Sequence, residues 1–327
     1  MACLGLADGH PRRSPAILTL RFTETHRGLL AALAAFSIWG LFSLYFKLLA
    51  IVPPLEVVAH RILWSALLCV LFLAGQGRLL ELQQILKDGR RMAGLAASSF
   101  CIALNWGFFV WAVQQGRAIE AGFGYFIYPL CMVGLGALLL GERLKPRQTG
   151  AIGLVFIGVA VLALSQGSIP WLVLVFPVSF SLYGLLRKII VVAPLTGLAV
   201  ETLLLSPFAI GLLWIEDGGV LAAPGDWMIK ALLVAAGPAT TLPLLLFAYA
   251  ARRLRLSTLG LAQYWNPTLQ VGIACLIFRE VFTFSYGLCF AFIWGGILLY
   301  AWPSRPLTSR DGGAISALTT AQGNRDP

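Results

Sequence analysis

The chain has 327 residues, of which 59% are hydrophobic and 12% charged, and its mean hydropathy is +0.84. A water-soluble protein normally carries about 25% charged residues, so this composition excludes an ordinary soluble enzyme or binding domain. The net charge of +10 does not indicate nucleic-acid binding, because the basic residues fall in short clusters between apolar runs and no basic face or aromatic RNA-binding motif accompanies them. We therefore expect an integral membrane protein.

Residues 1–27 contain prolines and arginines but no long apolar segment, and we interpret them as a cytoplasmic N-terminal tail. Ten apolar runs follow, each near the roughly 20 residues that a helix needs to cross the hydrocarbon core. We predict an all-α integral membrane fold with transmembrane helices at 28–50, 56–75, 92–113, 118–140, 146–164, 169–187, 196–215, 229–250, 256–278 and 284–302. Residues 303–327 form the predicted cytoplasmic C-terminal tail.

Basic residues in the connections between these runs predict the orientation of the chain. The even-numbered connections hold twelve of them, whereas the odd-numbered connections hold three, namely Arg117, Lys230 and Arg279. Loops rich in Lys and Arg stay on the cytoplasmic side of a membrane. Both termini and the even-numbered connections are therefore predicted to be cytoplasmic.

An internal repeat relates the two halves of the chain. A shift of 138 residues aligns three conspicuous pairs: Gly122 with Gly260, Pro129 with Pro267, and Gly158 with Gly296. We predict two five-helix units, 28–164 and 169–302. Because five is an odd number, the second unit must enter the membrane inverted relative to the first, which is a recurring architecture of secondary transporters.

The repeat-related prolines, Pro129 and Pro267, are predicted to interrupt the fourth and ninth spans near the middle of the membrane. A proline lacks a backbone N–H and disturbs the carbonyl four residues earlier. Interrupted helices at matching positions in two halves are a sequence pointer to a transporter's binding site. We therefore expect the solute cavity near these two prolines.

Polar side chains next to the prolines are candidates for the lining of this cavity. Gln263, Asn266 and Gln270 form one stripe on the ninth span, and Tyr125 and Tyr128 share a face of the fourth. Amides and phenols offer hydrogen-bond donors and acceptors without carrying a charge, which suits a polar solute. The alternative is that the same residues only form hydrogen bonds between helices.

Three charged residues within the spans also need an explanation, since inserting each into the membrane costs about 2.5–3.5 kcal/mol. Arg61 and Lys47 are candidates for contact with a substrate carboxylate, although Lys47 can alternatively extend to the membrane interface. Matching 54–55 with 194–195 makes Glu201 the repeat partner of Arg61. Glu201 is a candidate proton carrier; the alternatives are a static ion pair or a solvated interfacial acid.

A second repeat-related pair, Glu142 and Glu280, lies at the ends of apolar runs beside arginines. This position favours a role at the membrane surface over a role in transport. We interpret each glutamate as a polar lock of an interfacial hairpin.

Several short motifs together resemble the EamA-type family of the drug/metabolite transporter superfamily, in particular its RarD branch. The resemblance covers about residues 27–303 and rests on segments 37–40, 45–47, 60–65, 105–106, 125–129, 141–144, 181–184, 187–188 and 263–270. It implies a ten-helix carrier of the bacterial inner (plasma) membrane, often an exporter of metabolites or drugs.

We expect a secondary active transporter that exports a small polar or amphipathic metabolite or drug by alternating access around the midplane site. Its expected partners are the solute, the lipid bilayer and protons as coupling ion, with a homodimer left open; no nucleic acid, cofactor or metal is expected. The alternatives are a non-transporting membrane scaffold or sensor and, less favoured, an intramembrane enzyme. The sequence has neither a Walker-type phosphate loop nor a nucleophile–base or metal pair at membrane depth.

Overall fold

A computed structural model describes residues 24–141, 143–215, 219–222, 225–254 and 256–301. The described residues form α-helices joined by short connections, without a β-strand. Nine of these helical segments are long and apolar enough to cross a membrane. The protein is therefore an all-helical integral membrane protein, as its composition predicts.

The helices follow the predicted spans closely, with two short helices in addition. Their bounds are α1 (Glu24–Gly40), α2 (Phe42–Leu48), α3 (Pro54–Gly75), α4 (Leu79–Lys87), α5 (Gly89–Gln114), α6 (Ala118–Leu140), α7 (Pro146–Gln166), α8 (Trp171–Ile189), α9 (Pro194–Ile215), α10 (Gly219–Ala222), α11 (Trp227–Ala251), α12 (Leu256–Ala262), α13 (Trp265–Leu276) and α14 (Phe284–Ala301). Helices α1 and α2 form one continuous span, and α4 and α10 lie in predicted loops.

Helix starts follow local sequence rules. Pro54 and Pro146 occupy the first turns of α3 and α7, where the missing N–H of proline has no intrahelical partner to lose. Asp88 accepts a hydrogen bond from the backbone N–H of Arg91, and Asp226 accepts one from that of Met228. These carboxylates cap the N-termini of α5 and α11.

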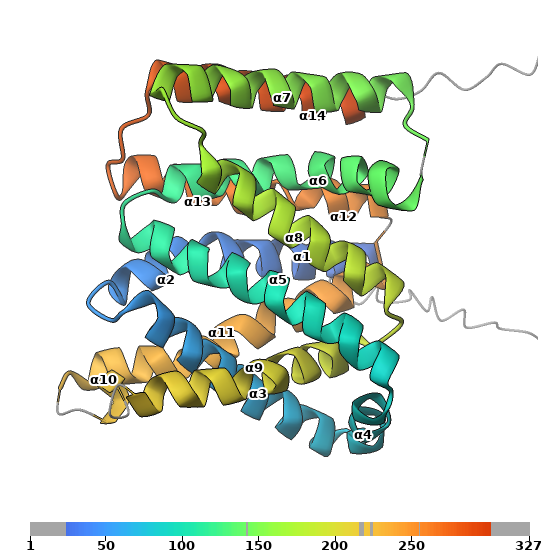
Figure 1. Ribbon diagram of the computed structural model, residues 1–327, viewed down its shortest axis with the longest axis vertical. Helices are drawn as coiled ribbons and strands as arrows, with labels where there is room; N and C mark the ends of the chain where they lie inside the picture. Colours follow the sequence, from blue (N-terminus) through green and yellow to red (C-terminus); the bar gives the residue numbers. More distant parts are fainter. Residues whose placement is uncertain (1–23, 142, 216–218, 223–224, 255, 302–327) are drawn as a thin grey trace, which may run out of the picture.

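The long helices lie side by side in layers (Figure 1). Helices α7 and α14 pair at one edge, α6 and α13 form the next layer, α1, α5 and α8 follow, and α3, α9 and α11 complete the bundle. Contacts between the halves follow a two-fold pattern: α5 packs on α8 as α11 packs on α1, and α6 packs on α8 as α13 packs on α1. This pattern supports two related five-helix units, whose inverted relationship stays a prediction.

The predicted ninth span, 256–278, is not one continuous helix. It divides into α12 and α13, with Gln263 and Tyr264 in a turn between them. Pro267 has no N–H to donate to the Gln263 carbonyl four residues earlier, and the backbone N–H of Asn266 donates to that carbonyl instead, at 3.2 Å. Pro267 therefore lies in the first turn of α13, and the break precedes it by three residues.

The prediction of a matching break at Pro129 is wrong, because α6 continues through this residue to Leu140. The Ser181 hydroxyl of α8 donates to the Tyr128 carbonyl at 3.3 Å, next to the proline. Pro129 leaves the Tyr125 carbonyl, not that of Tyr128, without its helical donor, so the bond from Ser181 joins α6 to α8 and does not replace the missing one. Helix α6 is packed between α8 and α13 along its length, and this packing holds it helical.

The helix ends gather at two opposite ends of the bundle (Figure 1). One of them, the basic end, holds the start of α1, α4, the α8–α9 connection and the end of α11. There Arg253 pairs with Glu24 at 2.8 Å, and Thr196 donates to Glu81 at 3.2 Å. Glu81 is partly exposed, and its hydrogen bond with Arg78 lowers the pKa of its carboxyl below the ordinary value. The opposite end holds the α2–α3, α5–α6 and α13–α14 connections.

Some predictions fall wholly or partly on residues outside the described ranges. Of the predicted N-terminal tail, 1–27, only 24–27 are described, and they already belong to α1. The predicted C-terminal tail, 303–327, and Glu142 lie outside these ranges. Glu280 is described: its carboxylate accepts the backbone N–H groups of Ala118 and Ile119 at 2.8 and 2.9 Å, which ties the α13–α14 connection to the start of α6.

Candidate solute-binding cavity

A cavity of about 520 Å³ lies in the middle of the bundle, between the two halves of the chain. Helices α1, α2, α3, α5 and α6 line it from the first half, and α8, α9, α11, the α12–α13 turn and α13 line it from the second. Its volume falls in the range of about 300–1,000 Å³ that is typical of small-molecule sites. Among the described residues, α7 and α14 contribute nothing to its wall.

Six of the predicted site residues line this cavity: Arg61, Tyr125, Tyr128, Gln263, Asn266 and Gln270. Pro267 lines it as well. The Gln270 side chain is almost fully buried and donates to Asn266 Oδ1 at 2.9 Å and, more weakly, to the Trp39 carbonyl at 3.5 Å. Gln270 Oε1 is buried and has no hydrogen-bond partner among the described residues. This acceptor is therefore unsatisfied in this conformation.

Asn105 of α5 holds the Tyr125 side chain in place at the cavity wall. Its Nδ2 donates to Ser179 Oγ of α8 at 3.1 Å, and its Oδ1 accepts from the Tyr125 hydroxyl of α6 at 2.8 Å. Asn105 is 1% exposed, so these bonds lie away from competing water. The ring of Tyr125 also stacks on Phe176 at 5.5 Å, and together these contacts hold the phenol at the cavity wall.

Arg61 lies at the deep end of the cavity and is 4% exposed. Its Nε donates to Thr240 Oγ1 of α11 at 2.7 Å. Its guanidinium carbon lies over the ring of Trp106, 4.1 Å from the centroid. Cation–π contacts of this kind offset part of the cost of burying the charge.

Glu201 lies just behind the cavity wall and is 1% exposed. Its carboxylate accepts from Ser98 Oγ at 2.6 Å and from the Tyr183 hydroxyl at 3.4 Å. Arg187 Nε lies 3.8 Å from the same carboxylate. Tyr183 and Arg187 both line the cavity, so a change of charge at Glu201 would be felt there through these two side chains.

Besides Glu201, two predicted site residues lie outside the cavity wall. Lys47 is exposed near the end of α2, and its ammonium group lies 5.6 Å from the ring centroid of Phe278; this position fits the interfacial alternative. Pro129 does not contribute to the wall.

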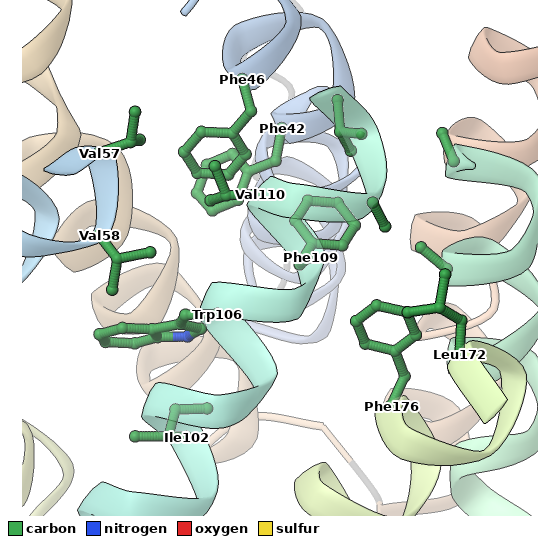
Figure 2. Packing of buried hydrophobic residues seen from close by; sticks show 14 of the residues in the cluster. Phe42, Phe46, Val57, Val58, Ile102, Trp106, Phe109, Val110, Leu172 and Phe176 are labelled. Atoms are coloured by element: carbon green, nitrogen blue, oxygen red, sulfur yellow. The ribbon is translucent and has the colours of Figure 1, made fainter. Parts of the chain in front are cut away.

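The cavity extends toward the basic end and is closed toward the opposite end. Its lining includes Val192 of the α8–α9 connection, Pro194 at the start of α9 and the exposed Arg252 at the end of α11. Toward the opposite end, buried aromatic rings pack edge to face: Phe46 on Phe109 at 6.0 Å, and Phe109 on Phe176 at 6.2 Å (Figure 2). We call Phe46, Phe109 and Phe176 the aromatic barrier.

Several residues that form the site are not among the candidates predicted from the sequence, although the sequence contains features that indicate some of them. Asn105 is a buried amide in the middle of an apolar span, a signal that polarity alone could have flagged. Arg187 adjoins Lys188 at the end of a predicted span, so the sequence alone places it among the basic residues of an even-numbered connection. The aromatic residues, such as Trp106 and Phe180, carry no sequence signal that separates cavity lining from ordinary packing.

Comparisons with known proteins agree with this architecture. The model of the EamA-like transporter family matches residues 26–164. An uncharacterized transporter of Pseudomonas aeruginosa is 45% identical over 286 residues, which cover 85% of this chain and 95% of that protein. Protein RarD of Salmonella typhimurium is 40% identical over 283 residues, with 85% and 95% covered.

A solved crystal structure has the same fold. It superposes with a TM-score of 0.57 at 19% sequence identity and covers 84% of this chain and 97% of its own. At this identity the likeness concerns the fold alone.

Proposed function

Because this chain belongs to the EamA-like transporter family and is a multi-pass bacterial membrane transporter of the drug/metabolite superfamily, we propose that it is a secondary active carrier whose solute binds in the central cavity. The observation that carries the proposal is the position of the cavity. It lies between the two halves and is lined by polar side chains of both, including Tyr125 and Asn266. Transporters built from repeats place their solute site at this interface.

The asymmetry of the cavity supports alternating access. Its lining reaches the basic end at Arg252, while the aromatic barrier and Gln114 close the other end. The Gln114 amide donates to the carbonyls of Leu49 and Val52, each at 3.1 Å, which ties the end of α5 to the α2–α3 connection. We propose that this conformation faces the cytoplasm, since the basic end is the cytoplasmic end under the positive-inside rule.

We propose that the chain exports a small polar or amphipathic metabolite or drug across the bacterial inner membrane. Proton coupling through Glu201 belongs to the same proposal. Its support is that a buried carboxylate, held by Ser98, Tyr183 and Arg187, adjoins the cavity.

Solute flux tests the carrier directly. The purified chain is reconstituted into liposomes, and gradient-driven movement of a broad panel of labelled metabolites and drugs is measured. We expect flux of at least one class of solute, and a loss of about fivefold in the Asn266→Leu or Gln263→Leu variant, because one hydrogen bond to a solute contributes about 1 kcal/mol. Lys47→Gln is the matched control, because its side chain is polar but exposed outside the cavity.

Two outcomes would count against this proposal. If no gradient-dependent flux occurs across the whole panel, a scaffold or sensor becomes the better assignment. If flux occurs and both amide variants transport as well as the Lys47→Gln control, the α12–α13 region does not belong to the pathway.

A further inference from the structure

Arg61 is a buried cation whose neighbours are almost all neutral and aromatic. Its guanidinium carbon lies 4.1 Å from the ring centroid of Trp106, 5.1 Å from that of Phe42 and 5.5 Å from that of Phe46. The Nε–H group of Arg61 donates its hydrogen bond to Thr240 Oγ1. A guanidinium carries five N–H donors in a fixed fork, so the terminal nitrogens still have donors to offer.

No carboxylate balances this charge within the described part of the chain. The three buried glutamates there have other partners: Glu201 pairs with Arg187, Glu120 with Arg117, and Glu56 lies 3.8 Å from His60. The titratable groups that act on Arg61 are the phenols of Tyr45 and Tyr125, which are uncharged at neutral pH. Arg61 therefore adds an uncompensated positive charge to the deep end of the cavity.

The remaining charges of the cavity have the same sign. Its charged lining residues are Arg61, Arg187 and Arg252, and the described lining includes no aspartate or glutamate. Arg187 is balanced by Glu201, whereas Arg252 is exposed at the basic end. A cavity with apolar walls and charge of one sign concentrates counter-ions of the opposite sign. The electrostatics thus favour an anion and disfavour a cation.

The wall between these arginines is largely aromatic. Rings that line it include Trp39, Trp106, Tyr125, Tyr128 and Phe180. Aromatic rings bind a planar solute through stacked or edge-to-face contacts, which a saturated ring of the same size cannot reproduce. The volume of about 520 Å³ accommodates a molecule of one or two rings with a short acidic arm.

We propose that the solute is an aromatic organic anion whose acidic group binds the terminal nitrogens of Arg61 while its ring lies between the aromatic side chains of the cavity. This inference rests on the proposed carrier function and deepens it by naming the class of solute. Arg61 is then the residue that selects for negative charge, and the aromatic wall selects for planarity.

Three small probes separate these two contributions without any mutation. Phenylacetate, phenylacetamide and cyclohexylacetate are titrated calorimetrically into the purified full chain in detergent at neutral pH. The first pair differs in charge at nearly constant shape, and phenylacetate differs from cyclohexylacetate only in the ring. We expect phenylacetate to bind at least tenfold more tightly than phenylacetamide, as charge-assisted hydrogen bonds predict, and several-fold more tightly than cyclohexylacetate.

Variants then test whether Arg61 is the source of the preference for a charged solute. Arg61→Gln should remove the preference for phenylacetate over phenylacetamide, Arg61→Lys should retain part of it, and Lys47→Gln should leave it unchanged. If Arg61→Gln does not yield folded protein, Arg61→Lys and the wild-type probe series still decide the question, because a Lys cannot reproduce the guanidinium fork.

Equal binding of acid and amide by the wild-type chain overturns the proposal, as does a preference that persists in Arg61→Gln or the absence of binding by all three probes. Flux of neutral or cationic solutes in liposomes, with no preference for acids, also overturns it while leaving the carrier function intact. Absence of flux for every solute would instead remove the carrier function itself.

Discussion

The Tyr125 hydroxyl donates a hydrogen bond to Asn105 Oδ1 at 2.8 Å, and this contact joins α6 to α5 at the wall of the cavity. Asn105 is 1% exposed, so the acceptor cannot turn to water if the donor is removed. We expect Tyr125→Phe to lower the free energy of unfolding by about 1–3 kcal/mol, the cost of leaving a buried polar group unsatisfied. Thermal unfolding of the purified variant in detergent measures this loss.

Tyr128→Phe is the matched control for this prediction. Its ring packs on Phe180 at 4.8 Å, and its hydroxyl has no hydrogen-bond partner in the described part of the structure. We expect this variant to unfold near the wild-type temperature. Equal destabilisation by the two substitutions would show that the Asn105 bond contributes no special stability.

The site was predictable from sequence where a polar side chain stands in an apolar span beside a helix-breaking residue. Gln263, Asn266 and Gln270 satisfy this condition, and all three line the cavity. Arg61 was identified from the insertion cost of a charge alone. These predictions agree with the structure because exposing a polar group to hydrocarbon is costly, so polar residues of membrane spans face the protein interior or a cavity.

Other features depend on tertiary context that a single sequence does not contain. Pro129 and Pro267 are related by the repeat, but neighbouring helices hold α6 continuous through the first, whereas the chain turns three residues before the second. The pairing of Arg187 with Glu201 joins α8 to α9, and nothing in the linear pattern connects these residues. Aromatic side chains are equally compatible with core packing and with cavity lining, so their role emerges only from the fold.

The repeat-related glycines Gly158 and Gly296 both lie at the contact between α7 and α14. A Cβ at Gly296 would lie 2.8 Å from the Ala151 carbonyl oxygen, and a Cβ at Gly158 would lie 3.1 Å from that of Cys289. We expect Gly296→Ala and Gly158→Ala each to destabilise the protein by about 1–3 kcal/mol, because backbone atoms must move apart.

Gly153→Ala is the control for this pair, since Gly153 lies on the same helix as Gly158 and a Cβ there meets nothing within 4 Å. This substitution should be neutral or slightly stabilising in thermal unfolding, as alanine favours a helix over glycine. If Gly153→Ala lowers the unfolding temperature as much as Gly296→Ala does, close helix packing is not the cause.

Glu280 caps the N-terminus of α6 from a distant part of the sequence. Both carboxylate oxygens accept backbone N–H groups, those of Ala118 and Ile119, and the negative charge also complements the helix dipole. We expect Glu280→Ala to cost about 1–2 kcal/mol of stability, as other helix caps do. Glu280→Gln, which keeps one acceptor but loses the charge, should fall between Ala and the wild type in thermal unfolding. A Gln variant as unstable as the Ala variant would contradict the contribution of the remaining acceptor.

Gly197 makes room for the Arg187 guanidinium beside Glu201. A Cβ at this position would overlap the terminal nitrogens of Arg187. Gly197→Ala should therefore displace Arg187 and leave the Glu201 carboxylate buried without its cation. If Glu201 carries the coupling proton, Glu201→Gln should abolish the pH dependence of solute flux, because the titrating group is gone. Gly197→Ala should shift this dependence to higher pH, because loss of the nearby cation favours the protonated carboxyl.

Flux in liposomes, measured over a series of pH values, distinguishes these outcomes. Gly211→Ala is the matched control: it adds the same methyl group to α9 at a position where nothing lies within 4 Å, and its profile should follow that of the wild type. A wild-type pH profile in Glu201→Gln would eliminate Glu201 as the proton carrier and leave the ion pair a structural role. A shift in Gly197→Ala but not in Gly211→Ala would trace the effect to Arg187, because this arginine is the cation that the added methyl group displaces.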